Sequence, residues 1–184
     1  QAVKIVEALC ADPDYFFDLY YNEEELAYLN EVLEEIFASE DENLSEKEKA
    51  IKILQYINSH VTYQWYDLTS YDCYETLTRG TGNCSEFSIC FRDLCILSGI
   101  DCFCIVGSND NSNLYYTYGD GTEHGWNLAR LDGVWYFVEP QYTKIYYEFD
   151  EFYEYFPVAV STGYIGEDGL IAISKEGLEF CLKW

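Results

Sequence analysis

Apolar residues recur every three or four positions in three segments of the first hundred residues, which is the spacing of one face of an α-helix. These segments are residues 23–37, a stretch that begins at Ser45, and residues 84–97. Ser45 and Glu48 have the spacing of a capping box, and Gly99 follows the third segment where a helix would stop. The pattern therefore predicts three amphipathic helices, and the third should be buried in the core.

The second half of the chain favours β-structure. Four short segments rich in β-branched and aromatic residues are expected to form strands: 102–106, 114–118, 124–131 and 134–138. Asp132 and Gly133 suit a type I′ turn and predict an antiparallel hairpin from the last two segments. Residues 109–113 have the composition of a loop. We therefore expect an α+β fold, with helices first and an antiparallel sheet after them.

No linker, repeat or low-complexity tract divides the 184 residues, so we expect a single domain. Residues 1–44 are predicted to form a helical N-terminal extension, with one helix starting near Pro13. Residues 45–142 are predicted to form the core of the fold, including a short helix over residues 72–77. Residues 143–184 are weakly patterned and are expected to add strand or coil that closes the sheet.

The chain carries 34 acidic against 10 basic residues, a formal net charge of −24. Such a charge repels nucleic-acid phosphates and anionic membrane surfaces, which are bound through basic patches. No run of about eighteen apolar residues occurs, so no membrane span is expected. The content of 49% hydrophobic residues indicates a folded domain. The negative charge argues against nucleic acid as a partner.

A glycine-containing turn at residues 80–83 places Cys84 on the first turn of the third helix. Unpaired N–H groups and the helix dipole favour the thiolate there, which is the nucleophilic form of cysteine. His124 opens a predicted strand, and Glu139 follows the next one. A thiol nucleophile needs a base, and the base needs an acceptor that fixes its tautomer. Cys84, His124 and Glu139 are therefore predicted to form a catalytic triad.

The other thiols and the second histidine fit ordinary roles. Cys90 and Cys95 lie on apolar helix positions, which is typical of core cysteines, and His60 is expected to cap a helix or to be exposed. No C-x-x-C pair occurs among the eight cysteines, so neither a metal site nor a cofactor is expected. Setting Cys84 aside leaves an odd number of cysteines, which predicts at least one further free thiol in a monomer.

Three blocks of residues resemble the bacterial transglutaminase-like superfamily, which has a papain-like Cys/His/Asp core. The blocks are Gly-Thr-Gly-Asn-Cys-Ser-Glu-Phe at 80–87, His-x-Trp-Asn at 124–127, and a segment at 132–140 that contains Asp-Gly-x-Trp-Tyr and ends in Val-Glu-Pro. They occur in order within roughly residues 50–142. The family's usual Asp-Pro-Thr is Glu-Pro-Gln in this chain, so Glu139 is one methylene longer than the usual acid.

The resemblance implies a papain-like fold in which residues 45–142 form the catalytic core. It places the helix that carries the thiol on a sheet that carries the imidazole and the acid. It also implies an oxyanion donor before the nucleophile, besides the Cys84 N–H itself. Papain-like enzymes often use Gln and transglutaminases often use Trp in this role, so Gln64 and Trp65 are both candidates.

The expected reaction is attack of the thiolate on an amide carbonyl to give a thioester, which water or an amine then resolves. Water would make the protein a peptidase or amidase, and an amine would make it a cross-linking transglutaminase. Hydrolysis is favoured for a small bacterial-type domain, with protein, peptide or cell-wall peptide as substrate. An arylamine acetyltransferase would share this chemistry, but no separate acyl-donor domain is seen.

An alternative of another class is a non-enzymatic binding or scaffold module with a degraded site, which the change from Asp to Glu at position 139 motivates. The chain begins at Gln1 and contains no methionine. This suggests that a preceding segment, which could have held an export signal, was removed. A secreted or cell-surface location is therefore favoured over a cytoplasmic one.

Overall fold

The computed structural model describes residues 21–38, 43–65, 72–108, 123–146, 164–165 and 170–172. Its helices are α3 (Glu23–Phe37), α4 (Glu46–His60), α5 (Cys73–Arg79), α6 (Cys84–Leu97) and the 3₁₀ helix η1 (Pro140–Tyr142). Its strands are β1 (Thr62–Tyr63), β2 (Thr81–Gly82), β3 (Cys102–Ser108), β4 (Glu123–Leu131), β5 (Val134–Glu139), β6 (Lys144–Tyr146), β7 (Tyr164–Ile165) and β8 (Leu170–Ala172). The helix expected near Pro13, the loop at 109–113 and the strand at 114–118 lie outside the described residues.

The helices begin where the sequence supplies capping side chains. Ser45 Oγ accepts the Glu48 N–H at 3.2 Å, and the Glu48 carboxylate accepts the Ser45 N–H at 2.9 Å, so the predicted capping box forms. Asn22 and Glu25 make the same arrangement at the start of α3. The predicted bounds of α3 and α6 are confirmed. No helix within the described residues is both long enough and apolar enough to cross a membrane.

Six strands form one sheet in the order β6-β5-β4-β3-β8-β7. β4 pairs antiparallel with β3 and with β5, and β5 pairs antiparallel with β6. The strands that carry His124 and Glu139 thus pair antiparallel as expected, whereas β8 pairs parallel with β3, so the whole sheet is mixed. The difference arises in the weakly patterned C-terminal part of the chain, where β7 and β8 have only two and three residues. Strands this short carry no alternation that would reveal how they pair.

β4 and β5 form the predicted hairpin. Asp132 and Gly133 have φ angles of 53° and 83°, as a type I′ turn requires at both central positions. The turn is also tied to the first residue of α4, because Asp132 Oδ1 accepts the Glu46 N–H at 3.0 Å and Glu46 Oε2 accepts the Asp132 N–H at 2.6 Å. These bonds hold one end of the hairpin against the helices.

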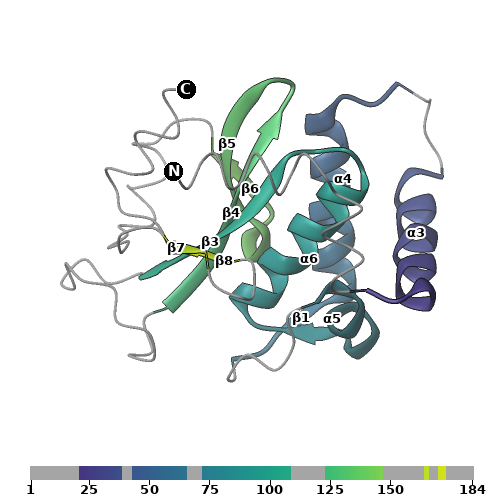
Figure 1. Ribbon diagram of the computed structural model, residues 1–184, viewed down its shortest axis with the longest axis horizontal. Coiled ribbons are helices and arrows are strands. Elements are labelled where there is room, and N and C mark those ends of the chain that lie inside the picture. The colour runs from purple at the N-terminus through teal and green to yellow at the C-terminus, as the bar shows by residue number, and fades with distance from the viewer. Residues whose placement is uncertain are drawn as a thin grey trace.

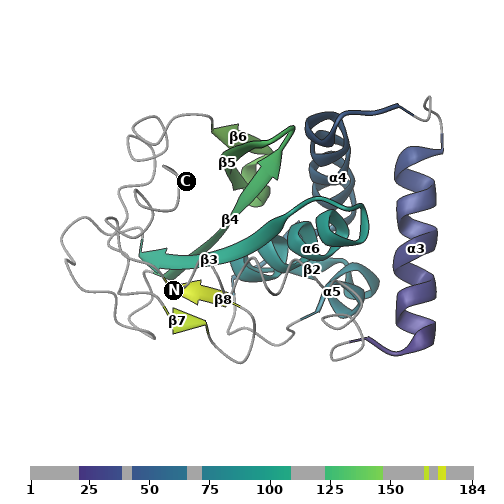
Figure 2. The ribbon, with the colours of Figure 1, turned by 45° about the horizontal axis from the view of Figure 1, so that its top comes forward.

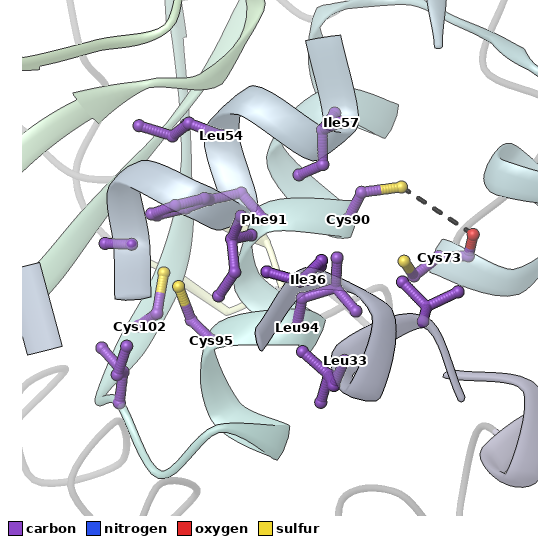
Figure 3. Close-up of a cluster of buried hydrophobic side chains, with 14 of the residues drawn as sticks. Leu33, Ile36, Leu54, Ile57, Cys73, Cys90, Phe91, Leu94, Cys95 and Cys102 are labelled. Atoms are coloured by element: carbon purple, nitrogen blue, oxygen red, sulfur yellow. Dashed lines mark hydrogen bonds between the residues drawn. The ribbon is translucent and has the colours of Figure 1, made fainter. Parts of the chain in front are cut away.

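Helix α6 lies between the sheet and the other helices. Figures 1 and 2 show the helices to one side of the sheet, with α3 farthest from it. Every residue of α6 from 86 to 95 is buried, so the helix is covered around its whole circumference. Figure 3 shows its apolar side chains, such as Phe91 and Leu94, packed against Leu33 of α3 and Leu54 of α4. The prediction that this helix is central and buried is confirmed.

A short parallel ladder between β1 and β2 holds the turn that leads into α6. The N–H groups of Thr62 and Gln64 donate to the carbonyl oxygens of Gly80 and Gly82, each at 2.9 Å. Gly80 ends α5 with a φ of 72°, a left-handed conformation that glycine adopts without strain. The turn before the nucleophile is therefore fixed by a neighbouring segment and not only by its own glycines.

The first turn of α6 packs directly against β4 at Gly125. A Cβ atom at this position would lie 3.0 Å from Ser85 Cα and 3.1 Å from Ser85 Oγ. Because one of these contacts is with backbone, a larger residue would require the strand or the helix to move. Cys84 and His124 are the neighbours of these two residues in the sequence. The contact therefore sets how closely the thiol can approach the imidazole.

Replacing Gly125 with alanine is expected to push β4 and α6 apart. The overpacked contact should lower the free energy of unfolding by about 1–3 kcal/mol, which urea denaturation measures. The substitution should also slow alkylation of Cys84 by iodoacetamide, because the thiol would lose its contacts with β4. Val134→Ala, at an exposed position of β5, is the control and should change neither quantity. Wild-type stability and alkylation in Gly125→Ala would contradict the packing argument.

Candidate active site

Asn83 caps the first turn of α6, which carries the thiol. Its Oδ1 accepts the N–H groups of Ser85 and Glu86 at 3.0 and 3.1 Å, and its carbonyl oxygen accepts the Phe87 N–H at 3.0 Å. The Glu86 carboxylate accepts the Asn83 N–H in return, at 2.9 Å, which completes a capping box. Of the N–H groups in this turn, the Cys84 N–H is the one that none of these bonds uses. It is therefore the group best placed to bind an oxygen atom next to the thiol.

Glu86 is a buried carboxylate whose partners hold the same turn in place. Its side chain is fully buried, and its Oε1 lies 2.5 Å from Arg79 Nη2, while Arg79 Nε donates to the Thr81 carbonyl oxygen at 3.1 Å. A buried charge is tolerated when it is paired and hydrogen-bonded. Arg79 and Glu86 thus connect the end of α5, the glycine turn and the start of α6. In the sequence, the signal for Glu86 is the Asn-x-x-Glu spacing at 83–86, which resembles that of a capping box.

His124 and Glu139 meet where β4 begins and β5 ends. His124 is 4% exposed and Glu139 is fully buried. Nε2 of His124 donates to Oε2 of Glu139 across 2.5 Å, a short charge-assisted hydrogen bond. The other carboxylate oxygen accepts the Gln141 N–H at 3.3 Å. The longer acid at position 139 therefore reaches the imidazole, and a second hydrogen bond fixes its orientation.

The Cys84 thiol makes hydrogen bonds with the His124 ring and with the Gly125 N–H. Because Nε2 of the ring is bonded to Glu139, we assign Nδ1 as the ring nitrogen that faces the sulfur. Burial raises the pKa of the Cys84 thiol, but the hydrogen bond and charge of His124 and the Gly125 N–H outweigh burial, so the pKa is lowered. The sequence predicted an activated thiol from the position of Cys84 at the helix N-terminus. The structure adds two hydrogen-bond donors to this effect, the His124 ring and the Gly125 N–H.

The pKa of the His124 imidazole shifts in the opposite direction. Burial lowers it, but the hydrogen bonds and negative charges of Cys84 and Glu139 raise it by more, to about 10. The two shifts together favour transfer of the proton from the sulfur to the ring. Cys84, His124 and Glu139 are therefore brought together in one hydrogen-bonded chain.

The two residues considered as oxyanion donors, Gln64 and Trp65, follow β1 and are exposed. Trp65 has 75% of its surface exposed. Gln64 is tied to the turn before the thiol, because its N–H donates to the Gly82 carbonyl oxygen at 2.9 Å. Trp65 lies one residue beyond this ladder. The role of either side chain as an oxyanion donor stays a prediction.

Two tyrosines that the sequence analysis did not single out lie near the thiol. Burial raises the pKa of Tyr63, as do the negative charges of Cys84 and Tyr142, so the three groups share one region. Tyr63 is 41% exposed and its ring centroid lies 6.5 Å from that of Phe87, while Tyr142 in η1 is 53% exposed. They offer exposed aromatic surface in the region of the thiol. The sequence did not identify them, because the chain contains 19 tyrosines and no spacing distinguishes these two from the others.

The second histidine and the two cysteines on the apolar face of α6 occupy positions that fit a structural role. His60 is exposed at the end of α4, where its ring stacks on Tyr56 at 3.9 Å between centroids and its Nδ1 contacts the Tyr56 carbonyl oxygen at 2.9 Å. Cys90 and Cys95 are buried in the core. In the part of the chain that the structure describes, no group of three or more His, Cys, Asp or Glu side chains could hold a metal ion.

The fold is similar to those of two solved proteins. The structure is similar to a solved protein described as a TGase, with a TM-score of 0.52 and 14% identity over 87% of this chain and 47% of that chain. It is also similar to a proposed cysteine protease from Cytophaga hutchinsonii, with a TM-score of 0.48 and 17% identity over 66% of this chain and 43% of that chain. The chain spans less than half the length of either solved chain. No curated protein matches the sequence.

The family model of the transglutaminase-like superfamily matches residues 30–140, a segment that contains Cys84, His124 and Glu139. The matched segment is more than half of the 184 residues. It confirms the resemblance seen in the three sequence blocks, and together with the TGase likeness it confirms the expected α+β papain-like core. The chain therefore belongs to the transglutaminase-like superfamily.

Proposed function

We propose that this protein is a thiol-dependent hydrolase of amide bonds, a cysteine peptidase or amidase. Cys84 is the nucleophile, His124 is the base and then the acid, and Glu139 orients the imidazole. The observation that carries the proposal is the hydrogen-bonded chain from the Cys84 sulfur through His124 to Glu139 at the start of a helix. Membership of the superfamily supports the same kind of chemistry, thiol-dependent acyl transfer or peptide hydrolysis.

In the first half of the proposed reaction, the Cys84 thiolate attacks the carbonyl carbon of an amide. The carbonyl oxygen becomes an oxyanion, which accepts a hydrogen bond from the Cys84 N–H and, as a candidate second donor, from the Gln64 side chain. The His124 imidazolium gives its Nδ1 proton to the leaving nitrogen, the C–N bond breaks, and a thioester remains. Glu139 holds the ring in position and stabilises its charged form.

In the second half, His124 is neutral and takes a proton from a water molecule that attacks the thioester carbonyl. The C–S bond breaks, a carboxylic acid leaves, and the thiolate and imidazolium are restored. Cys84 is only partly buried, which supports access of water to the thioester and therefore favours hydrolysis. An amine that replaced water would give a transglutaminase-type product through the same first half-reaction.

The site supports an enzyme better than a binding or scaffold module. That alternative came from the change of Asp to Glu, but Glu139 reaches the His124 ring at 2.5 Å and Cys84 is a free thiol. We propose peptide or protein substrates, cell-wall peptides included. The net charge of −24 favours basic or neutral substrates, and the exposed rings of Tyr63 and Tyr142 suit an apolar side chain of such a peptide.

The value of kcat/KM should follow a bell-shaped pH profile. Activity should rise as Cys84 loses its proton, below the ordinary pKa of a thiol, and fall as the His124 imidazolium loses its proton near its pKa of about 10. Glu139→Gln removes a charge that raises the His124 pKa, so the alkaline limb should move to lower pH and the maximum should fall by roughly 10²–10⁴-fold. Glu139→Asp is the control, because it keeps the charge. An alkaline limb that stays in place in Glu139→Gln would refute the assigned role.

Activity and its outcome are tested by incubating the protein with a peptide library and a free primary amine, followed by mass spectrometry. The wild type should produce hydrolysed peptides, and Cys84→Ala should reduce product by at least about 10³-fold. Cys104→Ala, which changes a buried thiol outside the hydrogen-bonded chain, should keep wild-type activity. Amine-linked peptides would reassign the reaction to cross-linking. The proposal fails if the wild type gives no product and iodoacetamide labels Cys84 no faster than the other cysteines.

A further inference from the structure

We propose that two pairs of buried cysteines, Cys73 with Cys90 and Cys95 with Cys102, form disulfides when the protein folds in the presence of a disulfide donor. The first bond would join α5 to the middle of α6, and the second would join the end of α6 to the start of β3. The inference is independent of the proposed catalytic function, because neither pair includes Cys84.

Cys73 and Cys90 face each other across the packing of α5 on α6. Both residues are fully buried. The Cys90 sulfur lies 3.8 Å from the Cys73 carbonyl oxygen, and the two thiols are within hydrogen-bonding range of each other. Figure 3 shows the Cys90 side chain directed towards Cys73. The backbone of Cys73 is held in this position, because its N–H donates to the Tyr21 hydroxyl at 2.7 Å.

Cys95 and Cys102 lie on either side of the turn that ends α6. Both are buried, with exposed fractions of 0% and 1%. Their thiols are within hydrogen-bonding range, and Figure 3 shows the two sulfur atoms side by side. The Ile100 N–H donates to the Cys95 carbonyl oxygen at 2.9 Å, so the turn is closed tightly just before β3 begins. The two sulfur atoms are therefore close together, which is the first requirement for a disulfide.

The remaining described thiols do not compete for these partners. Cys84 is bonded to His124 and Gly125. Cys104 lies on the same strand face as Cys102, and both sulfurs accept the Asn127 side-chain N–H, at 3.5 and 3.7 Å respectively. Residues two apart on a strand are separated by about 6.6 Å with parallel side chains, close to the limit for a disulfide. The geometry therefore selects two pairs and leaves the thiol of Cys84 reduced.

Each bond requires an external oxidant, which we take to be a small-molecule or protein disulfide R–S–S–R. A thiolate of the pair attacks one sulfur of the donor and releases one RS⁻, and the second cysteine thiolate then displaces the other. The pair is oxidised, and the donor is reduced to two thiols, whose protons are the two that the cysteines lose. Burial raises the pKa of Cys73 and Cys102, so few thiolates form in the folded protein. The exchange should therefore take place while the chain is folding.

The test is a peptide map of the wild-type chain refolded with a mixture of oxidised and reduced glutathione. The protein is then unfolded in guanidinium with iodoacetamide and without reductant, digested and analysed by mass spectrometry. We expect two linked peptide pairs, Cys73 with Cys90 and Cys95 with Cys102, and alkylated Cys84 and Cys104. Alkylation of any of the four paired cysteines in most molecules, or a different pairing among them, would overturn the proposal. This map needs no variant, so it does not depend on a substitution that might prevent folding.

A second measurement checks that the bonds form in the native structure. The wild type refolded in dithiothreitol should have a Tm about 5–15 °C below that of the wild type refolded with the glutathione mixture. The Cys73→Ala/Cys90→Ala variant should show a smaller Tm loss in dithiothreitol, because one of the two bonds is already absent. Cys104→Ala is the matched control, since it removes a buried thiol but no bond, and it should show the full loss. A Tm that reductant leaves unchanged in the wild type would overturn the proposal.

Discussion

Residue 125 is a glycine, and because it has no side chain, β4 touches the first turn of α6. The arrangement of the candidate site depends on this contact. Gly125 meets the backbone of Ser85 at a distance that would leave a Cβ only 3.0 Å from Ser85 Cα. The residues beside them, Cys84 and His124, are thereby brought within hydrogen-bonding range. Hydrogen bonds weaken steeply as distance and angle depart from their optimum. The pKa of the Cys84 thiol therefore depends on how closely the backbones of β4 and α6 pack as well as on the side chains around the thiol.

Two buried carboxylates hold the elements that meet at this contact. Glu86 is paired with Arg79 and accepts the Asn83 N–H, which joins α5 to the start of α6. Glu139 is paired with His124, which joins the end of β5 to β4. In a chain with a net charge of −24, most carboxylates gain by staying in water, whereas these two are fully buried. Separation of either pair would leave an uncompensated charge inside the protein, so both pairs favour the assembled arrangement over an open one.

Much of the fold could be predicted because its main elements carry local signals. The apolar stripes predicted the bounds of α3 and α6, with Gly99 as the stop of α6. The capping box at Ser45 predicted the start of α4, and the Asp132-Gly133 dipeptide predicted the hairpin. The three candidate triad residues could be selected by chemical type and chain order, and the structure places them together. The parallel pairing of β8 with β3 and of β1 with β2 could not be predicted, because such short strands have no periodicity. The nearness of Tyr63 and Tyr142 to the thiol likewise results from tertiary packing, which leaves no mark on local sequence.

The way the chain divides the site between elements has a consequence for biosynthesis. His124 and Glu139 belong to a single hairpin and are 15 residues apart, whereas Cys84 reaches them only after an entire helix has docked on the sheet. Contacts between near neighbours in the chain form with less loss of entropy than distant ones. A partly folded molecule can thus possess a polarised imidazole while its cysteine still behaves as an ordinary surface thiol. The contacts that lower the pKa of the thiol therefore form only when α6 has docked on the sheet.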